Sequence, residues 1–162
     1  PAVKTPAELA RPLYYLMSKS EYKKMLKIND RDSLKHAIDR FWLSNIKDKS
    51  TAKSVISRYY KRVEEANKQF SNYKEGWKTD PGMIYILFGP PWYVNRSLDR
   101  MQWSYSYDRQ DPRYNFYFEL SQMTNKYYPF ENYILQRSNQ YYSIEYQQRQ
   151  LWLTGQILNR NI

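Results

Sequence analysis

The chain has 162 residues, a formal net charge of +10 and no cysteine. Its length suits one domain, or one domain with a helical appendage, and the lack of cysteine excludes disulfides and cysteine-based metal or nucleophilic chemistry. No apolar run approaches the roughly 18 residues of a membrane span, and no signal peptide is present. We therefore expect no membrane span, and we expect any targeting signal upstream of Pro1 in a longer protein.

Basic residues and tyrosines are concentrated in opposite halves of the chain. Residues 1–75 contain 17 Lys and Arg against 9 Asp and Glu, whereas residues 76–162 contain 9 against 7. Tyrosine shows the reverse distribution, with 6 of its 18 residues before Gly76. Positive charge and aromatic surface are therefore expected on different elements of the fold.

The first half has the apolar period of helices, close to 3.6 residues. Short helices are predicted over residues 8–17 and 21–28, and longer ones over residues 34–46 and 52–70. Aspartate and serine residues that could cap the two longer helices are Asp30, Asp32, Asp48 and Ser50. The lysines and arginines between the apolar positions are expected on the solvent side.

Residues 76–91 combine a turn, an apolar run and a second turn. Gly76 is predicted to end the preceding helix in the left-handed conformation, with Trp77 filling the joint beside it. Residues 80–83 predict a type II turn, and the apolar residues 83–88 predict a strand that is covered on both faces. The residues of this structural motif are Gly76, Trp77, Thr79, Asp80, Gly82, Gly89, Pro90 and Pro91.

Alternating apolar and polar residues in the second half predict strands. Residues 101–107 and 114–120 should form a hairpin, residues 130–137 a further strand, and the chain from Asn139 onward a closing helix. The order of these elements predicts an α+β fold, with N-terminal helices packed on a small antiparallel β-sheet and a C-terminal helix.

The spacing Gly76-Trp77-x-Thr79-Asp80-x-Gly82, followed by the apolar run and Gly89-Pro90-Pro91, resembles the signature of the GWxTD domain. This resemblance extends over residues 34–120. It implies a member of a family of mostly exported proteins, found largely in Bacteroidota. It therefore implies a place in the cell envelope, in the periplasm or attached to the outer membrane as a lipoprotein. It implies no molecular function.

Together, the helical pattern and the resemblance divide the chain into three parts. Residues 1–30 are expected to be a linker with short helices, residues 31–138 a GWxTD-like α+β domain, and residues 139–162 a C-terminal helical extension.

Residues suited to catalysis or cofactor binding are scarce. His36 is the single histidine and lies on a predicted helix, which leaves no catalytic triad and no histidine-rich metal site. The four glycines form no phosphate-binding loop, and no spacing singles out two carboxylates as acid and base. The sequence thus predicts a protein that is not an enzyme and holds no metal or cofactor.

Protein docking is the function that the residue pattern favours. Trp92 and Tyr93 follow Pro91 on a predicted loop, and Arg96 and Arg100 are expected to form a polar rim around them. These four residues are the predicted binding site for a protein partner. Two alternatives remain: carbohydrate binding on exposed tyrosines and tryptophans, and non-specific, salt-sensitive binding of nucleic acid or another polyanion by the basic helices.

Overall fold

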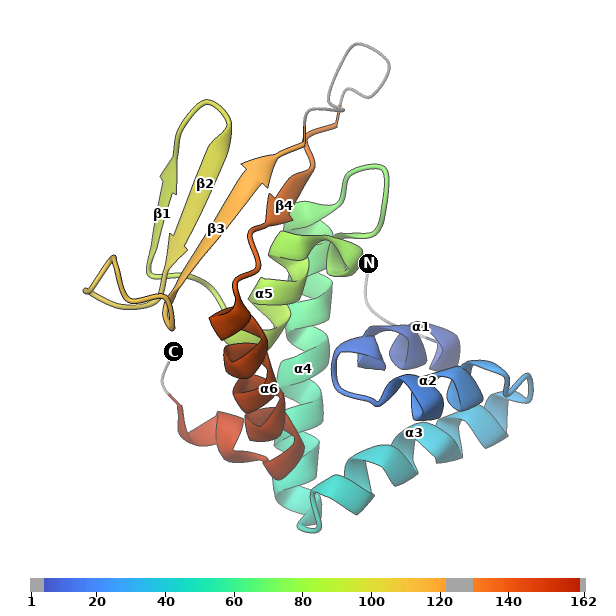
Figure 1. The fold of residues 1–162 in the computed structure, drawn as a ribbon. Helices are drawn as coiled ribbons and strands as arrows, with labels where there is room; N and C mark the ends of the chain where they lie inside the picture. Colours follow the sequence, from blue (N-terminus) through green and yellow to red (C-terminus); the bar gives the residue numbers. More distant parts are fainter. Residues whose placement is uncertain (1–4, 122–129, 161–162) are drawn as a thin grey trace. The chain divides into compact units, whose positions relative to one another are not determined.

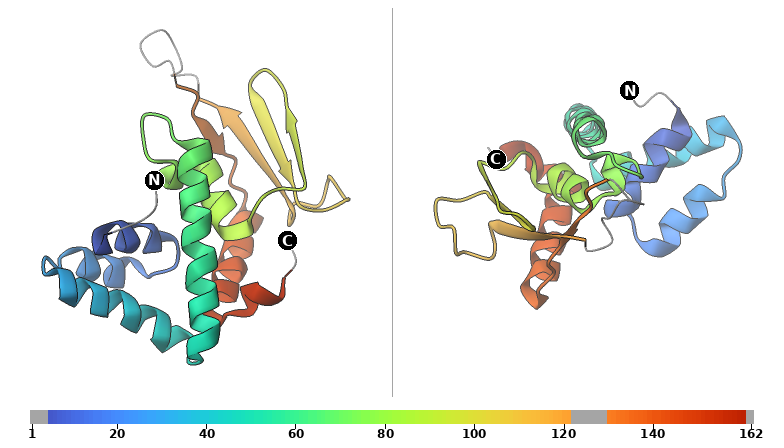
Figure 2. Two further views of the ribbon diagram at one scale, coloured as in Figure 1. Left: turned by 180° about the vertical axis from the view of Figure 1, so that it is seen from behind. Right: turned by 90° about the horizontal axis from the view of Figure 1, so that it is seen from above.

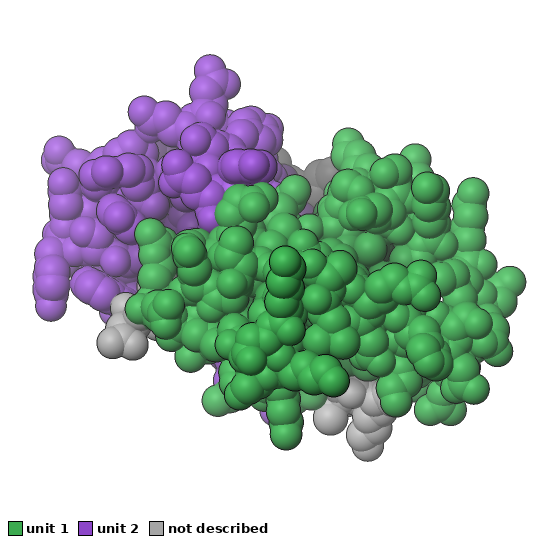
Figure 3. Space-filling model, turned by 90° about the horizontal axis from the view of Figure 1, so that it is seen from below, with its two compact units in different colours: residues 1–64, 149–161 green, residues 65–148, 162 purple. Residues whose placement is uncertain are grey.

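The computed structural model describes residues 5–121 and 130–160 and has the α+β architecture that the sequence predicts (Figure 1). The chain forms two compact units, residues 1–64 with 149–161 and residues 65–148 with 162 (Figure 3). Helices α4 (Lys49–Phe70) and α6 (Asn139–Thr154) contribute to both units. The sequence pattern instead predicts boundaries after residues 30 and 138, and residues 1–4 of the predicted linker lie outside the described residues.

The first unit is helical, as its apolar period predicts. Asp30 and Asp48 are the caps used by the two long helices: their carboxylates accept hydrogen bonds from the backbone N–H of Ser33 at 2.8 Å and of Thr51 at 2.7 Å. The other elements of this unit are α1 (Pro6–Ala10), the 3₁₀ segment η1 (Arg11–Tyr15), α2 (Lys19–Leu26), α3 (Arg31–Asn45) and η3 (Gln156–Asn159).

Aromatic side chains form the core of the first unit. The ring of Tyr59 is fully buried and lies edge-on to Trp42 and Trp152, with centroid distances of 5.6 and 5.2 Å. Its hydroxyl donates a hydrogen bond to the carbonyl oxygen of Pro12 at 2.6 Å, so the one polar atom of the ring is satisfied. The apolar stripe predicted for residues 52–70 thus supplies the buried face of α4.

The second unit contains a four-stranded antiparallel sheet in the order β1-β2-β3-β4. Its strands are β1 (Tyr93–Arg96), β2 (Arg100–Ser104), β3 (Asn115–Leu120) and β4 (Tyr133–Leu135). Trp103 pairs with Phe116 and Met101 with Phe118, which confirms the predicted hairpin. The further strand predicted within residues 130–137 is β4, whereas β1 occupies residues that were expected to be a loop.

The prediction of a buried strand over residues 83–88 is wrong, because these residues lie in helix α5 (Asp80–Phe88). The predicted type II turn over residues 80–83 is wrong for the same reason, since it is the first turn of α5. Every residue from Pro81 to Phe88 is buried. A helix covered on all sides is apolar on all sides, so the run carries no period that would separate it from a buried strand.

The sheet has an apolar inner face and a solvent-exposed outer face. On the inner face, the ring of Phe116 lies 4.6 Å from that of Phe88 on α5, and Trp103 lies 5.4 Å from Phe70 at the end of α4. Figure 2 shows α5 alongside the strands. Exposed residues on the outer face are Tyr93, Asn95, Arg100, Tyr117, Glu119 and Ile134.

Candidate functional site

The two glycines of the Gly-Trp-x-Thr-Asp motif occupy places where no side chain fits. The motif begins with the 3₁₀ segment η2 (Gly76–Lys78). A Cβ atom on Gly76 would lie 2.0 Å from the carbonyl oxygen of Ala66 on α4, and one on Gly82 would lie 1.9 Å from the carbonyl oxygen of Gly76. The predicted left-handed conformation at Gly76 is wrong. The glycine that follows α5 is Gly89, which has a positive φ of 89° but an extended ψ of −171°.

The polar groups of the motif are engaged in holding the chain together. Thr79 caps α5: its hydroxyl donates to the carbonyl oxygen of Gly76 at 2.7 Å and accepts from the N–H of Gly82 at 3.0 Å. The carboxylate of Asp80 accepts from the N–H of Leu135 on β4 at 2.8 Å and pairs with Arg137 at 3.2 Å. Asp80 thereby attaches the start of α5 to the sheet.

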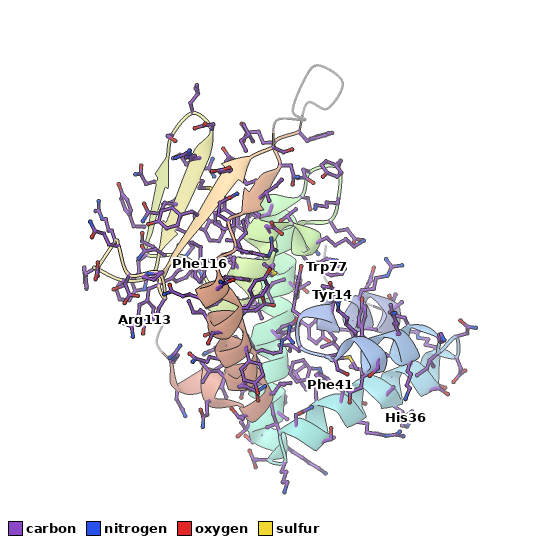
Figure 4. The ribbon with its side chains drawn as sticks, in the orientation of Figure 1. Tyr14, His36, Phe41, Trp77, Arg113 and Phe116 are labelled. Atoms are coloured by element: carbon purple, nitrogen blue, oxygen red, sulfur yellow. The ribbon has the colours of Figure 1, made fainter. Side chains whose placement is uncertain are left out.

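Trp77 is buried, as the sequence predicts, and is labelled in Figure 4. Its backbone N–H donates to the side-chain oxygen of Asn67 at 3.0 Å, and its indole N–H donates to Glu75 at 2.8 Å. We define the joint as residues 76–82, in which the side chains of Trp77, Thr79 and Asp80 are committed to contacts within the fold.

An exposed aromatic cluster lies at the end of the sheet where β1 begins. Trp92, Tyr93 and Tyr107 are 55%, 46% and 94% exposed. The ring of Trp92 lies edge-on to Tyr107 at 5.4 Å, and the guanidinium of Arg109 lies 4.5 Å from the ring centroid of Tyr93. We call Trp92, Tyr93, Tyr107 and Arg109 the aromatic surface.

The loop over residues 105–114, which carries Tyr107 and Arg109, is anchored to the sheet by buried or half-buried amides. The side chain of Asn115 is buried and donates to the carbonyl oxygens of Asp108 at 2.8 Å and Asp111 at 2.7 Å. The amide of Gln102 on β2 donates to the carbonyl oxygen of Arg109 at 3.1 Å. These bonds hold the aromatic surface in place before any partner arrives.

An ion pair stiffens the same loop. The guanidinium of Arg113, labelled in Figure 4, lies 2.7 Å from the carboxylate of Asp111. The side-chain hydrogen bond from Arg113 lowers the pKa of Asp111 below its ordinary value, and the same bond raises the pKa of Arg113. The carboxylate of Asp111 also accepts from the backbone N–H of Arg113 at 2.9 Å, which closes a turn.

Two of the predicted binding residues lie away from the other two. Trp92 precedes β1 and Tyr93 begins it, whereas Arg96 ends it, about 10 Å beyond Tyr93 along an extended strand. Arg96 lines a pocket of about 350 Å³ together with Phe70, Met101 and Tyr133. Arg100 lies 3.8 Å from Glu119 on the neighbouring strand.

The cation beside the aromatic pair is Arg109, which the sequence reasoning did not select. The signal that could have found it is the turn at Asp111-Pro112. This turn, a few residues after Tyr107, returns the chain to the sheet. It therefore keeps the loop near the end of β2, beside the start of β1.

The described part of the chain has few residues suited to catalysis or metal binding. His36 is exposed on α3, and its Nδ1 lies 2.7 Å from the carbonyl oxygen of Asp32 (Figure 4). Within residues 5–121 and 130–160, no three His, Asp or Glu side chains gather as metal ligands would. None of the helices described there combines the length and apolar character needed to cross a membrane.

The GWxTD domain family model matches residues 1–154, and the chain therefore belongs to the GWxTD domain family. The match is wider than the resemblance over residues 34–120 and includes the N-terminal helices and all of α6. No curated protein and no solved structure matches the chain.

Proposed function

We propose that this protein is a non-enzymatic docking domain of the bacterial cell envelope, which binds a protein partner through its aromatic surface. The observation that carries the proposal is the cluster of three exposed aromatic rings, two of them in contact with each other and one covered by Arg109. Single exposed apolar residues are common on soluble proteins, but contiguous ones mark interaction sites.

The composition of the aromatic surface suits the centre of a protein interface. Trp, Tyr and Arg are the residues most enriched among those that dominate binding energies. Each aromatic ring contributes a large area with few rotatable bonds, and each carries a polar group for a directional contact. Arg109 can stay on Tyr93 and still direct its N–H donors toward a partner.

Rigidity of the site supports the same function. The loop that carries Tyr107 and Arg109 is held by Asn115, Gln102 and the Asp111–Arg113 pair, so little conformational entropy is lost when a partner binds.

The proposed location follows from the family. Proteins with GWxTD domains are mostly exported, and we place this one in the periplasm or at the outer membrane, attached as a lipoprotein. The partner is then another component of the envelope.

The test is partner capture from envelope extract of the source cell, with the full-length protein as bait. Trp92→Ser with Tyr93→Ser should reduce capture at least about tenfold, because hot-spot aromatics each contribute about 2 kcal/mol or more. The matched control is Tyr142→Ser with Tyr146→Ser on α6, which removes two rings that are 60% and 62% exposed. Capture that survives the first pair of changes and is lost with the second would contradict the proposal.

Two further outcomes separate the alternatives. Binding to a glycan array that disappears with the Trp92 and Tyr93 changes would identify a carbohydrate site instead of a protein site. Affinity for heparin is expected to be weak and to fall steeply with salt, because it would come from dispersed lysines on the helices. Heparin binding that persists at physiological salt would favour the polyanion alternative.

A further inference from the structure

Strand β1 lies at an edge of the sheet and has only β2 as a described neighbour. All four of its residues, Tyr93–Arg96, are exposed. It contains neither proline nor lysine, the residues that often protect an edge from pairing with another chain.

The register shows which backbone groups of β1 point away from the sheet. The N–H of Ser97 donates to the carbonyl oxygen of Arg100 at 2.9 Å, next to the paired residues Arg96 and Met101. Hydrogen-bonded and non-hydrogen-bonded pairs alternate in an antiparallel ladder. Tyr93 and Asn95 therefore bond to β2, while the N–H and C=O groups of Val94 and Arg96 face outward.

No other described segment takes up these outward groups. The backbone atoms of Val94 and Arg96 make no hydrogen bond to any described residue outside the sheet. The outward N–H and C=O groups of Val94 and Arg96 are thus two donors and two acceptors in a row, at the spacing of a strand. The side chain of Val94 is 40% exposed, so this edge is open to solvent. This is the arrangement that accepts an added strand.

The charge along this edge favours an acidic segment. Arg96 lies on β1, Arg109 covers Tyr93 at its start, and no described carboxylate lies within ion-pair distance of either guanidinium. Arg100, which begins the neighbouring strand, already faces Glu119 at 3.8 Å and adds little to this charge. A second copy of this chain is a poor occupant, because each copy carries a formal charge of +10 and would bring its own Arg96 and Arg109 to the contact.

We propose that β1 binds an extended, acidic segment of the partner as a fifth strand of the sheet. This inference rests on the proposed docking function and specifies its mode: main-chain hydrogen bonds to Val94 and Arg96, with the aromatic surface holding the end of the segment. One acidic side chain of the added strand points to the inner face, toward Arg96, and another points to the outer face, toward Arg109 beside Tyr93. These two contacts give the site its preference for an acidic ligand.

The experiment is a selection of random peptides of about eight residues, the length of a strand, against the complete chain. Arg96 pairs with the buried Met101 and so lies on the inner face, whereas Tyr93 and Arg109 are on the outer face. The expected ligands therefore have two Asp or Glu residues about three positions apart, one for each face of the added strand. Binding should slow amide hydrogen exchange at Val94 and Arg96 by at least about tenfold and leave helix α2 unaffected.

Variants at Val94 separate main-chain pairing from side-chain contact. Val94→Pro removes an outward N–H and no bond to β2, and it should weaken the selected peptides at least about tenfold, or about 1.4 kcal/mol. Val94→Ala keeps the N–H and should retain most of the affinity. The exchange measurement on the unmodified chain stands even if Val94→Pro reduces stability.

Different results would contradict the added strand and the docking function. Peptides that are basic or helical in pattern, a selection that yields no ligand, or unchanged exchange at Val94 and Arg96 would overturn the added strand. If envelope capture is nevertheless lost with the Trp92 and Tyr93 changes, the docking function stands and only its mode is wrong.

Discussion

The joint and the aromatic surface lie in the same unit and place their aromatic residues in opposite ways. In the joint, Trp77 is buried, and Thr79 and Asp80 use their side chains to bond backbone groups of the fold. In the aromatic surface, Trp92 and Tyr93 are half-exposed, and the side chains of Gln102 and Asn115 hold the neighbouring loop that carries Tyr107 and Arg109.

This difference separates the part of the chain that identifies the family from the part that we propose to bind a partner. The side chains of Trp77, Thr79 and Asp80 in the joint each have a structural task, so the joint has little capacity left for a ligand. The aromatic surface has exposed rings and little role in packing. The predictions below test that division, from the largest expected effect to the smallest.

Gly76→Ala should have the largest effect. The added methyl group would meet the carbonyl oxygen of Ala66 at 2.0 Å, and both are backbone-fixed, so relief requires α4 and η2 to separate. We expect a loss of about 3 kcal/mol or more in the free energy of unfolding, or failure to fold. Soluble expression and denaturant melts measure this, with the exposed Lys78→Ala as the mild control. Near-normal stability of the Gly76 variant would contradict the close approach.

Trp77→Ala should cost about 3 to 5 kcal/mol, as other large-to-small aromatic changes in cores do. The ring is buried, and its removal would also leave Glu75 without the indole donor that it now accepts from at 2.8 Å. Thermal and urea melts provide the measurement. An unchanged melting temperature would mean that the ring is free of the core in solution.

Thr79→Val should cost about 2 kcal/mol, because it removes the cap of α5 and the hydrogen bond to Gly76 while keeping the side chain's shape. Thr79→Ser keeps the hydroxyl and should restore most of the loss. Near-normal stability of Thr79→Val together with a loss in Thr79→Ser would show that the methyl group, and not the hydroxyl, is what matters.

Acid should weaken the loop of the aromatic surface by a small amount. The pKa of Asp111 is lowered in the folded protein by Arg113, so this stabilisation is full above the unfolded pKa and is lost as pH falls through the folded value. The melting temperature should therefore decline between about pH 5 and about pH 3, and Asp111→Asn should remove part of that decline. Identical pH profiles for the two proteins would exclude this contribution.

The sequence predicts the parts of the fold that depend on local chemistry. The caps at Asp30 and Asp48, the stripe on α4, and the alternation in β2 and β3 all follow from periods and side-chain acceptors near in sequence. Residues 83–88 were misassigned because β-branched and aromatic residues favour strands, while the Thr79 cap and complete burial impose a helix.

The candidate site was only partly predictable. Trp92 and Tyr93 follow a rigid proline pair, which is a local signal. The turn at Asp111-Pro112 predicts that the loop returns to the sheet, but the contact of Arg109 with Tyr93 also depends on the register of β2 and β3. Arg96 and Arg100 are close to the pair in sequence, yet an extended strand carries them away from it.

The most direct test of the division measures stability and partner capture on the same two variants. Trp92→Ser with Tyr93→Ser should change the free energy of unfolding by less than about 1 kcal/mol and abolish capture, because both rings are largely outside the core. Thr79→Val should lower the melting temperature and leave capture intact at temperatures where the protein is folded. The reverse pattern, capture lost with Thr79→Val and stability lost with the aromatic changes, would place the binding site in the joint and contradict the account.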